Sequence, residues 1–595
     1  MSARELITEH LELWTGAVTK KSSSGRVSNG KVELTGIKKL RELILQLAVM
    51  GRLVKQDAED EPASSILESI DDEIANLVKQ GCIRFPKRVP SVDDSDKAFE
   101  IPESWQWVRL GNLALHSEAG WSPKCHDTPR ENENWGVLKV SAVTWGQFQP
   151  SENKELPDNL TPRPEYQVQP SDFLISRANT AELVARSVVV PEGAPRRLMM
   201  SDKIIRFVFS QHVDPLYVNL FNNSSYARAY YLSVAGGTSS SMKNVSRAQI
   251  QALAMPLPPK TEQHRIVQKV DELMALCDRL EQHTSDQLEA HETLVDTLLG
   301  TLTQSEKATE LADNWARLAA HFDTLFTTEQ SIDKLKQTIL QLAVMGRLVE
   351  QNFSSADSSP LLQKIESKRA QLVQQGKLKG SSRQCISEKI DAPFNLPANW
   401  SWVRVSDLLP DFQNGASSRG DKSGSEVIVL RLADITNLQI TLNDPRRLLI
   451  SNSSISKYAV REGHILIIRV NGSADLVGRF IPVEEPFDGI FCDHFIRMRT
   501  DSEIIDPRFF ALAGSTNLVR SRIEDLFVST AGQKTVNQKH IGSLLAPLPP
   551  IEEQHRIVQK VHELMALCDQ LKERLSQATE TRNQLAAAVV EGAQN

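Results

Sequence analysis

An eleven-residue segment, ILQLAVMGRLV, occurs twice in this chain, at residues 44–54 and again at residues 339–349. The same offset of 295 residues relates Trp105 to Trp400 and Gly81 to Gly376. A second repeated segment that begins with PLPP covers residues 256–280 and 547–571, where 21 of 25 residues are identical. A period near 300 residues is far longer than the roughly 20 to 50 residues of solenoid or propeller units. The chain is therefore predicted to contain one architectural unit twice.

Between the repeated blocks lie two variable segments, residues 113–255 and 409–546, whose sequences have diverged. A few landmarks remain in step, because FLISRAN at 173–179 parallels ILIIRVN at 465–471 and LVAR at 183–186 parallels LVGR at 476–479. We interpret the variable segments as two domains that share a fold but differ in their surfaces. Ala185 stands where the second copy has Gly478, so we expect the first domain to deviate locally at this turn.

Composition limits the classes of protein that the chain can belong to. Its 595 residues, 40% hydrophobic, predict several globular domains. Six cysteines without a C-x-x-C pair fit a reducing compartment, and we expect no bound metal. No apolar run is long enough for a membrane span, so we expect a cytoplasmic protein. The net charge of -7 lies in the repeated frame, because the two variable segments count +1 and 0 and the remainder -8. Charge alone therefore does not indicate a surface that binds nucleic acid, because neither variable segment has a large excess of basic residues.

The repeated blocks have the apolar spacing of helices, and the first block is expected to end near Gly51 and Gly346 as a glycine C-cap would. From Ile557 to Val589 the seam residues advance in alternating steps of four and three, the period of a coiled coil, and Arg582 is the only charged residue among these otherwise apolar positions. In the first copy, Thr284, Gln287 and His291 interrupt the seam. These polar residues either fix register and partner choice or mark simple divergence, and the sequence favours neither.

Short β-rich runs fill the variable segments, at residues 137–143, 172–175, 186–190 and 204–209 and at 427–432, 464–470, 479–483 and 491–498. Trp105 and Trp400 precede each segment and are expected to seat an entry strand in the core. We thus predict an α+β protein with two mixed α/β domains, long antiparallel coiled-coil-like helices and a pseudo-two-fold tandem repeat. The expected boundaries are a helical region at 1–104, domains at 105–259 and 400–550, a central helical region at 260–399 and a final helix at 551–595.

This arrangement, with PLPP-x-x-EQ-x-x-I at the exit of each variable segment and LVGR inside the second, resembles the specificity subunits of type I restriction-modification systems. The resemblance covers nearly the whole chain and implies that each variable segment is a target recognition domain. It also implies double-stranded DNA, two DNA adenine methyltransferase subunits and restriction/translocase subunits as partners. S-adenosylmethionine, ATP and Mg would then serve those partners, with no cofactor bound by this chain.

The same role has a physical argument. Two different domains suit an asymmetric target read in two places about one helical turn apart, ~34 Å. A helix of about 30 residues spans roughly 45 Å, so its length would act as a ruler for the spacer. No phosphate loop, dinucleotide turn, H-E-x-x-H or methyltransferase motif occurs, and we expect a non-catalytic subunit.

Arginine and asparagine at equivalent strand ends are the preferred DNA contacts, since Arg pairs with guanine or phosphate and Asn with adenine. Their alternative is a structural turn. The preferred pairs are Arg177 with Asn179 and Arg469 with Asn471. The other candidates are Lys139, Ser141, Arg186, Lys203, Arg206, Lys243, Arg419, Lys422, Arg431, Arg479, His494, Arg497 and Lys534.

Two other classes of function stay open at this stage. The negative net charge also suits a coiled-coil scaffold that joins proteins and never meets DNA. An enzyme with an unfamiliar site in one domain is the third hypothesis.

Overall fold

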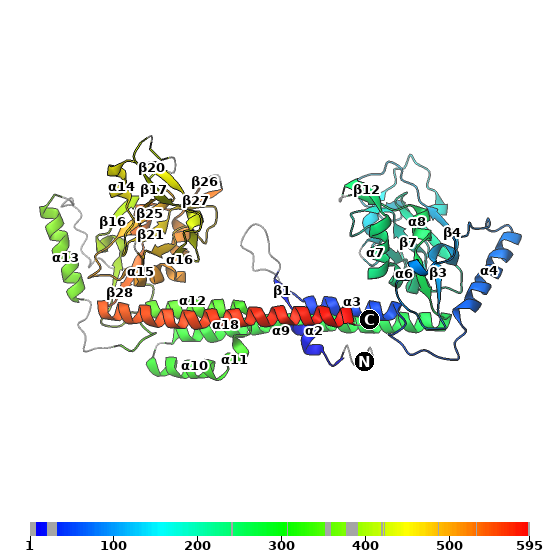
Figure 1. The fold of residues 1–595 in the computed structure, drawn as a ribbon, viewed down its shortest axis with the longest axis horizontal. Helices are drawn as coiled ribbons and strands as arrows, with labels where there is room; N and C mark the ends of the chain where they lie inside the picture. Colours follow the sequence, from blue (N-terminus) through cyan, green and yellow to red (C-terminus); the bar gives the residue numbers. More distant parts are fainter. Residues whose placement is uncertain are drawn as a thin grey trace. The chain divides into compact units, whose positions relative to one another are not determined.

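The computed structural model describes residues 8–20, 32–144, 146–239, 242–305, 307–351, 359–376, 391–417, 420–421, 423–485, 487–530 and 532–592. The chain divides into two compact units (Figure 1). Unit 1 comprises residues 1–22, 29–286 and 579–595, and unit 2 comprises residues 23–28 and 287–578.

Unit 1 contains the first α/β domain. Its strands are β3 (Gln106–Arg109), β4 (Ala114–Ala119), β5 (Gly136–Leu138), β6 (Asn153–Glu155), β7 (Phe173–Ser176), β8 (Ala178–Asn179), β9 (Ser187–Val189), β10 (Leu198–Met199), β11 (Ile204–Phe209), β12 (Gly236–Ser239), β13 (Met242–Asn244) and β14 (Ala254–Leu257). Its helices are α5 (Leu110–Leu113), α6 (Pro215–Asn222), α7 (Ser225–Val234) and α8 (Arg247–Gln251).

Unit 2 contains the second α/β domain. Its strands are β15 (Ser401–Arg404), β16 (Asp411–Asn414), β17 (Ser425–Leu430), β18 (Ile435–Thr436), β19 (Gln439–Ile440), β20 (Arg447–Ile450), β21 (Ile465–Ile468), β22 (Val470–Asn471), β23 (Phe480–Pro482), β24 (Gly489–Phe491), β25 (Phe495–Arg499), β26 (Val528–Thr530), β27 (Gln533–Thr535) and β28 (Leu545–Leu548). Its helices are α14 (Asn452–Tyr458), α15 (Pro507–Gly514), α16 (Asn517–Leu526) and α17 (Gln538–Gly542).

The two domains share the order of their main sheets, and the second domain has a further short pair, β18-β19. A four-stranded antiparallel sheet has the order β4-β11-β7-β9 in the first domain and β16-β25-β21-β23 in the second. Each domain adds two three-stranded sheets, which are β12-β13-β8 and β10-β5-β6 in the first domain and β22-β27-β26 and β20-β17-β24 in the second. Each domain also has a pair in which the entry strand meets the exit strand, β3 with β14 or β15 with β28. The shared fold expected from the landmarks is thus confirmed.

Most predicted strands occur, with two corrections. Residues 137–143 do not form one strand, because β5 ends at Leu138 and a 3-10 helix follows at Val140–Val143. Residues 491–498 contain the end of β24, a turn and most of β25. In both places the change of direction falls at small or polar residues inside an otherwise apolar run.

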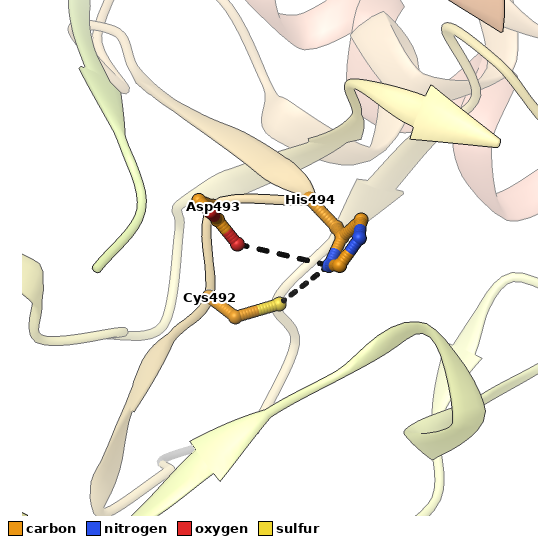
Figure 2. A group of neighbouring side chains, drawn as sticks. All are labelled: Cys492, Asp493 and His494. Atoms are coloured by element: carbon orange, nitrogen blue, oxygen red, sulfur yellow. Dashed lines mark hydrogen bonds and ion pairs between the residues drawn. The ribbon is translucent and has the colours of Figure 1, made fainter. Parts of the chain in front are cut away.

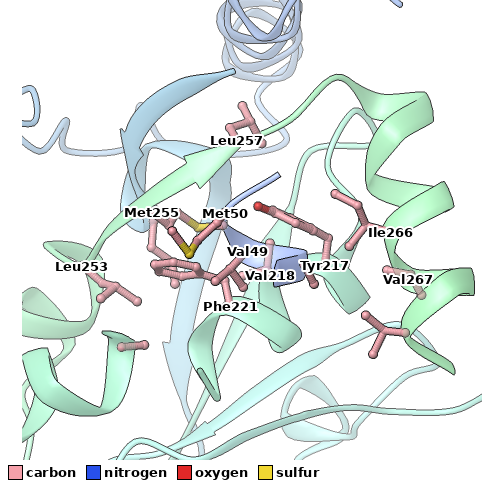
Figure 3. Packing of buried hydrophobic residues seen from close by; sticks show 14 of the residues in the cluster. Val49, Met50, Tyr217, Val218, Phe221, Leu253, Met255, Leu257, Ile266 and Val267 are labelled. Carbon is pink, nitrogen blue, oxygen red and sulfur yellow. The ribbon is translucent and has the colours of Figure 1, made fainter. Parts of the chain in front are cut away.

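The frame in unit 1 consists of α2 (Leu11–Gly16), the short pair β1 (Thr19–Lys20) and β2 (Val32–Glu33), α3 (Thr35–Val49), α4 (Ala63–Lys79) and the beginning of α9 (Lys260–Gln304). Its apolar residues form one core with the first α/β domain, and the end of α18 (Ile551–Gly592) also contributes to it. Figure 3 shows Val49 and Met50 of the frame against Tyr217 and Phe221 of α6. The domain and its part of the frame therefore share a single hydrophobic core.

The frame in unit 2 consists of the end of α9, the beginning of α18, α10 (Ala308–Ala320), α11 (Phe322–Leu325), α12 (Glu329–Val344) and α13 (Ser359–Gln374). Val295 of α9 and Ile557 of α18 belong to the same core as the second domain. In each unit the start of one long helix meets the end of the other, as the expected antiparallel pairing requires. The predicted α+β class with two mixed domains and long helices in tandem repeat is confirmed.

The long helices exceed the expected length of about 30 residues, since α9 has 45 residues and α18 has 42. The predicted seam holds through Ile557, Val561 and Cys568, which are buried. It is wrong near the end of α18, where Leu585 is exposed and Ala586 is buried instead. The helices of the described ranges lack the uninterrupted apolar length that crossing a lipid bilayer requires.

The glutamate of the PLPP-x-x-EQ motif holds the domain entry to the frame. In unit 1 the buried Glu262 carboxylate accepts hydrogen bonds from Trp105 Nε1 (2.9 Å) and Gln56 Nε2 (2.6 Å). Gly51 lies beside them at φ 71°, and a Cβ there would lie 2.6 Å from Pro102 Cγ, so glycine is required. The predicted core position of Trp105 and the predicted glycine helix end are thus explained by one contact.

The second copy repeats this anchor with one difference. Glu553 accepts hydrogen bonds from Gln351 Nε2 (2.6 Å) and Asn399 Nδ2 (3.3 Å). Trp400 is buried like Trp105, but its Nε1 forms no hydrogen bond within the described residues.

The glutamine of the motif fastens the first helix of the domain that follows the main sheet. Gln263 Oε1 accepts from the backbone N–H of Asp214 (2.8 Å), and its Nε2 donates to the carbonyl of Pro258 (3.0 Å). Gln554 makes the equivalent bonds to Asp506 (2.7 Å) and Pro549 (3.0 Å). Both glutamine side chains are fully buried.

We expect Gln263→Ala to destabilise the first domain by about 2 kcal/mol, because it leaves a buried N–H and a buried carbonyl without partners. Amide hydrogen exchange in α6 would measure the loss, with α15 of unit 2 as the internal control. Unchanged exchange in α6 would contradict this role.

Candidate nucleic-acid interface

Four predicted residues of the first domain meet where the main sheet passes into the three-stranded sheet. Arg177 separates β7 from β8, and its backbone N–H donates to the carbonyl of Lys203 (2.9 Å). Asn179 of β8 lies opposite Lys243 of β13. We call Arg177, Asn179, Lys203 and Lys243 the first junction cluster.

The first junction cluster presents cations and an amide at the surface. Arg177 and Lys203 are exposed, and neither side chain forms an ion pair or hydrogen bond within the described residues. Lys243 Nζ donates to the carbonyl of Gly237 (2.8 Å), and Asn179 Nδ2 donates to Thr144 Oγ1 (3.3 Å). Two cationic groups are therefore available for a ligand, and the other two residues are held in place.

The second domain gathers the equivalent residues. The backbone N–H of Arg469 donates to the carbonyl of His494 (2.7 Å), and Asn471 of β22 lies opposite Lys534 of β27. We call Arg469, Asn471, His494 and Lys534 the second junction cluster. The scaffold is the same, but histidine replaces lysine.

Side-chain contacts also differ between the two clusters. Arg469 is half-buried and its Nη1 donates to the carbonyl of Asp493 (3.2 Å), whereas Arg177 is exposed. Lys534 Nζ donates to the carbonyl of Gly472 (3.0 Å). The chemistry at the junction thus varies while the backbone pairing persists.

Arg206 is a correction to the predicted contacts, because it lies in the interior. Its Nη1 donates to Asp172 (3.0 Å) and to the carbonyl of Gln167 (2.9 Å), while Nη2 bonds to Glu118 and to the carbonyl of Glu165. Burial alone would lower the pKa of Arg206, but the hydrogen bonds to Glu118 and Asp172 outweigh it and the pKa is raised. The guanidinium fastens a loop to the main sheet and does not reach a surface.

Arg497, the equivalent residue of the second domain, is also internal. It donates to the carbonyls of Lys457 (3.2 Å) and Ala459 (2.9 Å) and lies over the ring of Phe491. His464 occupies the place that Asp172 has in the first domain, so this guanidinium has no acidic partner there. Its predicted contact with DNA is wrong for the same reason as that of Arg206.

Arg186 and Arg479 are half-buried beside arginines that the sequence analysis missed. Arg228 of α7 donates to the carbonyl of Val184 (2.7 Å), and Arg520 of α16 donates to the carbonyl of Val477 (2.8 Å). Burial and then the charge of Arg186 lower the pKa of Arg228 to about 10.

In the second domain, burial and then the charge of Arg479 lower the pKa of Arg520 to about 10. Each domain therefore holds two charged guanidinium groups close together. The sequence indicated these buried arginines only through their spacing, because Arg228 and Arg520 lie at the same distance along the chain from the FLISRAN and ILIIRVN landmarks.

The Arg228 contact also fixes the turn at the LVAR element. Ala185 adopts φ 57°, and Gly478 adopts φ 73°. Their backbone N–H groups donate to Ser176 (2.8 Å) and Ile468 (2.7 Å). The expected local deviation at Ala185 is wrong, because the alanine tolerates the left-handed conformation that its neighbours impose.

The other candidates do not join the junction clusters. Lys139 and Ser141 both face Glu152, at 3.6 Å and 2.6 Å. Arg431 forms an ion pair with Asp434 (3.0 Å). Arg419 and Lys422 lie outside the described residues.

Two antiparallel strand pairs lie in the polar segments that precede the exit strands. β12 pairs with β13, β26 pairs with β27, and the second strand of each hairpin pairs with the strand that carries the junction asparagine. Each hairpin therefore supports a junction cluster.

Comparison with known proteins gives a consistent result. The family model described as the type I restriction modification DNA specificity domain matches residues 102–290 and 400–581. The EcoEI and EcoAI type I restriction enzyme specificity subunits of Escherichia coli are 35% identical over 604 residues and 33% identical over 613 residues, each covering 100% of both chains.

A solved HsdS subunit from Thermoanaerobacter tengcongensis is 18% identical, with a TM-score of 0.41, and the match covers 84% of this chain and 98% of that chain. The family model covers more than half of the chain and includes both variable domains, and the full-length relatives agree with it. The chain belongs to the family of type I restriction modification DNA specificity proteins.

Proposed function

We propose that this chain is the sequence-specific DNA recognition subunit of a type I restriction-modification complex and reads an asymmetric, bipartite target. One observation carries the proposal. Two domains with the same main-sheet order repeat an arginine, an asparagine and a lysine at equivalent junction positions and differ at Lys203 and His494, in a chain whose family is described by DNA specificity.

Each junction cluster would read one half of the target. An arginine can bond two acceptors of guanine or a phosphate, and asparagine can bond adenine in the same groove. Lys203 and Lys243 add phosphate contacts that set position without reading sequence. Because His494 replaces Lys203 in the second domain, the two halves of the target are expected to differ.

The chemistry in this proposal belongs to partner subunits. Relatives of this chain are specificity subunits of restriction enzymes, which supports a role in selecting the site. Two adenine methyltransferase subunits would dock on the helical frame, and restriction/translocase subunits would join them. S-adenosylmethionine, ATP and Mg²⁺ would be used by those partners, in the cytoplasm where the DNA target lies.

A domain exchange tests the proposal. Residues 113–255 are replaced by the equivalent segment of another specificity subunit, the protein is copurified with its methyltransferase, and methylated adenines are mapped across host DNA. We expect one half of the target to change and the other half to persist. Methylation at an unaltered target would overturn the proposal.

Arg177→Ala is expected to weaken DNA binding by about 1–3 kcal/mol without loss of stability, because the side chain is exposed. If its contact is a phosphate, the slope of binding against log salt should also fall by about one. Mobility shifts of the methyltransferase complex at several salt concentrations measure both effects. Lys79→Ala, at the exposed end of α4, is the matched control and should bind like wild type. If Arg177→Ala binds DNA with wild-type affinity, Arg177 is not a DNA contact.

A further inference from the structure

Cys492, Asp493 and His494 form the turn between β24 and β25. Their ligand atoms, a thiol sulfur, a carboxylate oxygen and an imidazole nitrogen, all lie within 4.8 Å of one another (Figure 2). His494 Nδ1 lies 3.5 Å from Cys492 Sγ and 3.8 Å from Asp493 Oδ1. Within the described ranges of the chain, no other group of three such residues gathers in this way.

We propose that this turn binds one Zn²⁺ ion through Cys492 Sγ, Asp493 Oδ1 and His494 Nδ1. Thiolate and imidazole together favour zinc over the hard cations Mg²⁺ and Ca²⁺. Tetrahedral zinc with ordinary bond lengths separates sulfur from nitrogen by about 3.6 Å and nitrogen from oxygen by about 3.4 Å. The two distances in the turn therefore need only small side-chain rotations.

The oxygen and sulfur atoms have few competing partners. Asp493 Oδ1 is shielded from solvent and forms no hydrogen bond with the described residues. The Cys492 side chain is 1% exposed, and its hydrogen bond to His494 Nδ1 joins two of the proposed ligands. The His494 side chain is 42% exposed, which leaves a route for the ion and for a water as fourth ligand.

Electrostatics at the turn allow a dication. Binding would displace the thiol proton, and one thiolate with one carboxylate then neutralises the ion. Of the nearby cations, Arg431 is paired with Asp434 and Arg469 bonds the carbonyl of Asp493.

The first domain lacks this ligand set, because its equivalent turn is Ser201, Asp202 and Lys203. The chain also supplies a control of matched composition in Cys125, His126 and Asp127. There the Asp127 carboxylate bonds Lys154 Nζ (2.7 Å). We therefore expect one zinc site per chain, in the second domain.

The site has a consequence that rests on the proposed function. The carbonyl oxygens of Asp493 and His494 both accept hydrogen bonds from Arg469. A bound ion would stiffen this turn and so hold the arginine of the second junction cluster, whereas Arg177 has no such support.

The test uses Co²⁺ as a visible substitute for Zn²⁺ on the metal-stripped full chain. We expect one equivalent of Co²⁺ to give a sulfur-to-cobalt charge-transfer band that Zn²⁺ abolishes. Cys492→Ser should lose the band, and His494→Lys, which copies the residue of the first domain, should lower Co²⁺ affinity at least tenfold. Cys125→Ser should retain the band at full strength.

Circular dichroism confirms that each variant is folded, and His494→Lys decides the question if Cys492→Ser is not. The site is excluded if wild type shows no band, if His494→Lys binds Co²⁺ with wild-type affinity, or if Cys125→Ser loses the band as Cys492→Ser does. None of these readouts involves DNA, so failure of the metal site and failure of the proposed function are distinguishable.

Discussion

Replacing Arg206 with alanine should destabilise the first domain by about 3–5 kcal/mol, the cost of removing one partner from a buried ion pair. The Asp172 carboxylate is 91% buried, since its side chain is 9% exposed. Burial already raises the pKa of Asp172 despite the adjacent guanidinium, so the carboxylate depends on Arg206 for its charge. The carbonyls of Gln167 and Glu165 would lose a donor as well.

Amide hydrogen exchange in β7 and β11 measures this effect, and unit 2 of the same chain is the internal reference. Arg497→Ala is the matched variant in the second domain. It removes hydrogen bonds to two carbonyls but strands no carboxylate, so about 1–2 kcal/mol is expected. Equal losses in the two domains would show that the Asp172 ion pair contributes nothing specific.

The second domain should lose about 3 kcal/mol of stability as the pH falls from about 6.5 to about 4. Burial, and then the charges of Arg497, Arg499 and Arg461, lower the pKa of His464 to about 4. The unfolded chain takes up a proton near pH 6.5, whereas the folded domain does not until about pH 4. The stabilisation is therefore complete above pH 6.5 and is lost on acidification. Geometry agrees, because His464 Nδ1 accepts a hydrogen bond from the backbone N–H of Arg461 (3.0 Å) and must be unprotonated.

Urea unfolding of the second domain at several pH values checks this expectation against His464→Asn. Asparagine keeps an acceptor for the Arg461 N–H but cannot be protonated in this range. The variant should lack the histidine contribution, while the carboxylates common to both proteins cancel in the comparison. Identical pH dependence in wild type and variant would refute the assignment.

Much of the fold could be predicted because local physics decided it. The helix end at Gly51 could be predicted because glycine adopts the left-handed conformation of a helix terminus without steric cost, and its φ is 71°. The core position of Trp105 follows from the repeated entry strand. The polar hairpins β12-β13 and β26-β27 could not be found in this way. Their residues are too polar for the sequence to indicate strands. They form strands because β13 pairs with β8 and β27 pairs with β22.

The candidate site could be predicted in part. Arg177 and Asn179 belong to a repeated landmark, and the structure places them with Lys203 and Lys243. Arg206 was listed among the candidate contacts, but both faces of β11 are buried, and the sequence cannot show which polar residue has an internal partner. Arg228 was missed because its contact with Val184 joins residues 44 positions apart.

The anchors at Glu262 and Gln263 recur at Glu553 and Gln554, although the domains that they hold have diverged. The attachment chemistry is thus independent of what each domain recognises. A foreign domain whose first helix after the main sheet begins with an aspartate would meet the same buried glutamate and glutamine in either unit. New specificities can therefore arise when a whole α/β domain is exchanged, without a change in the helices that carry it.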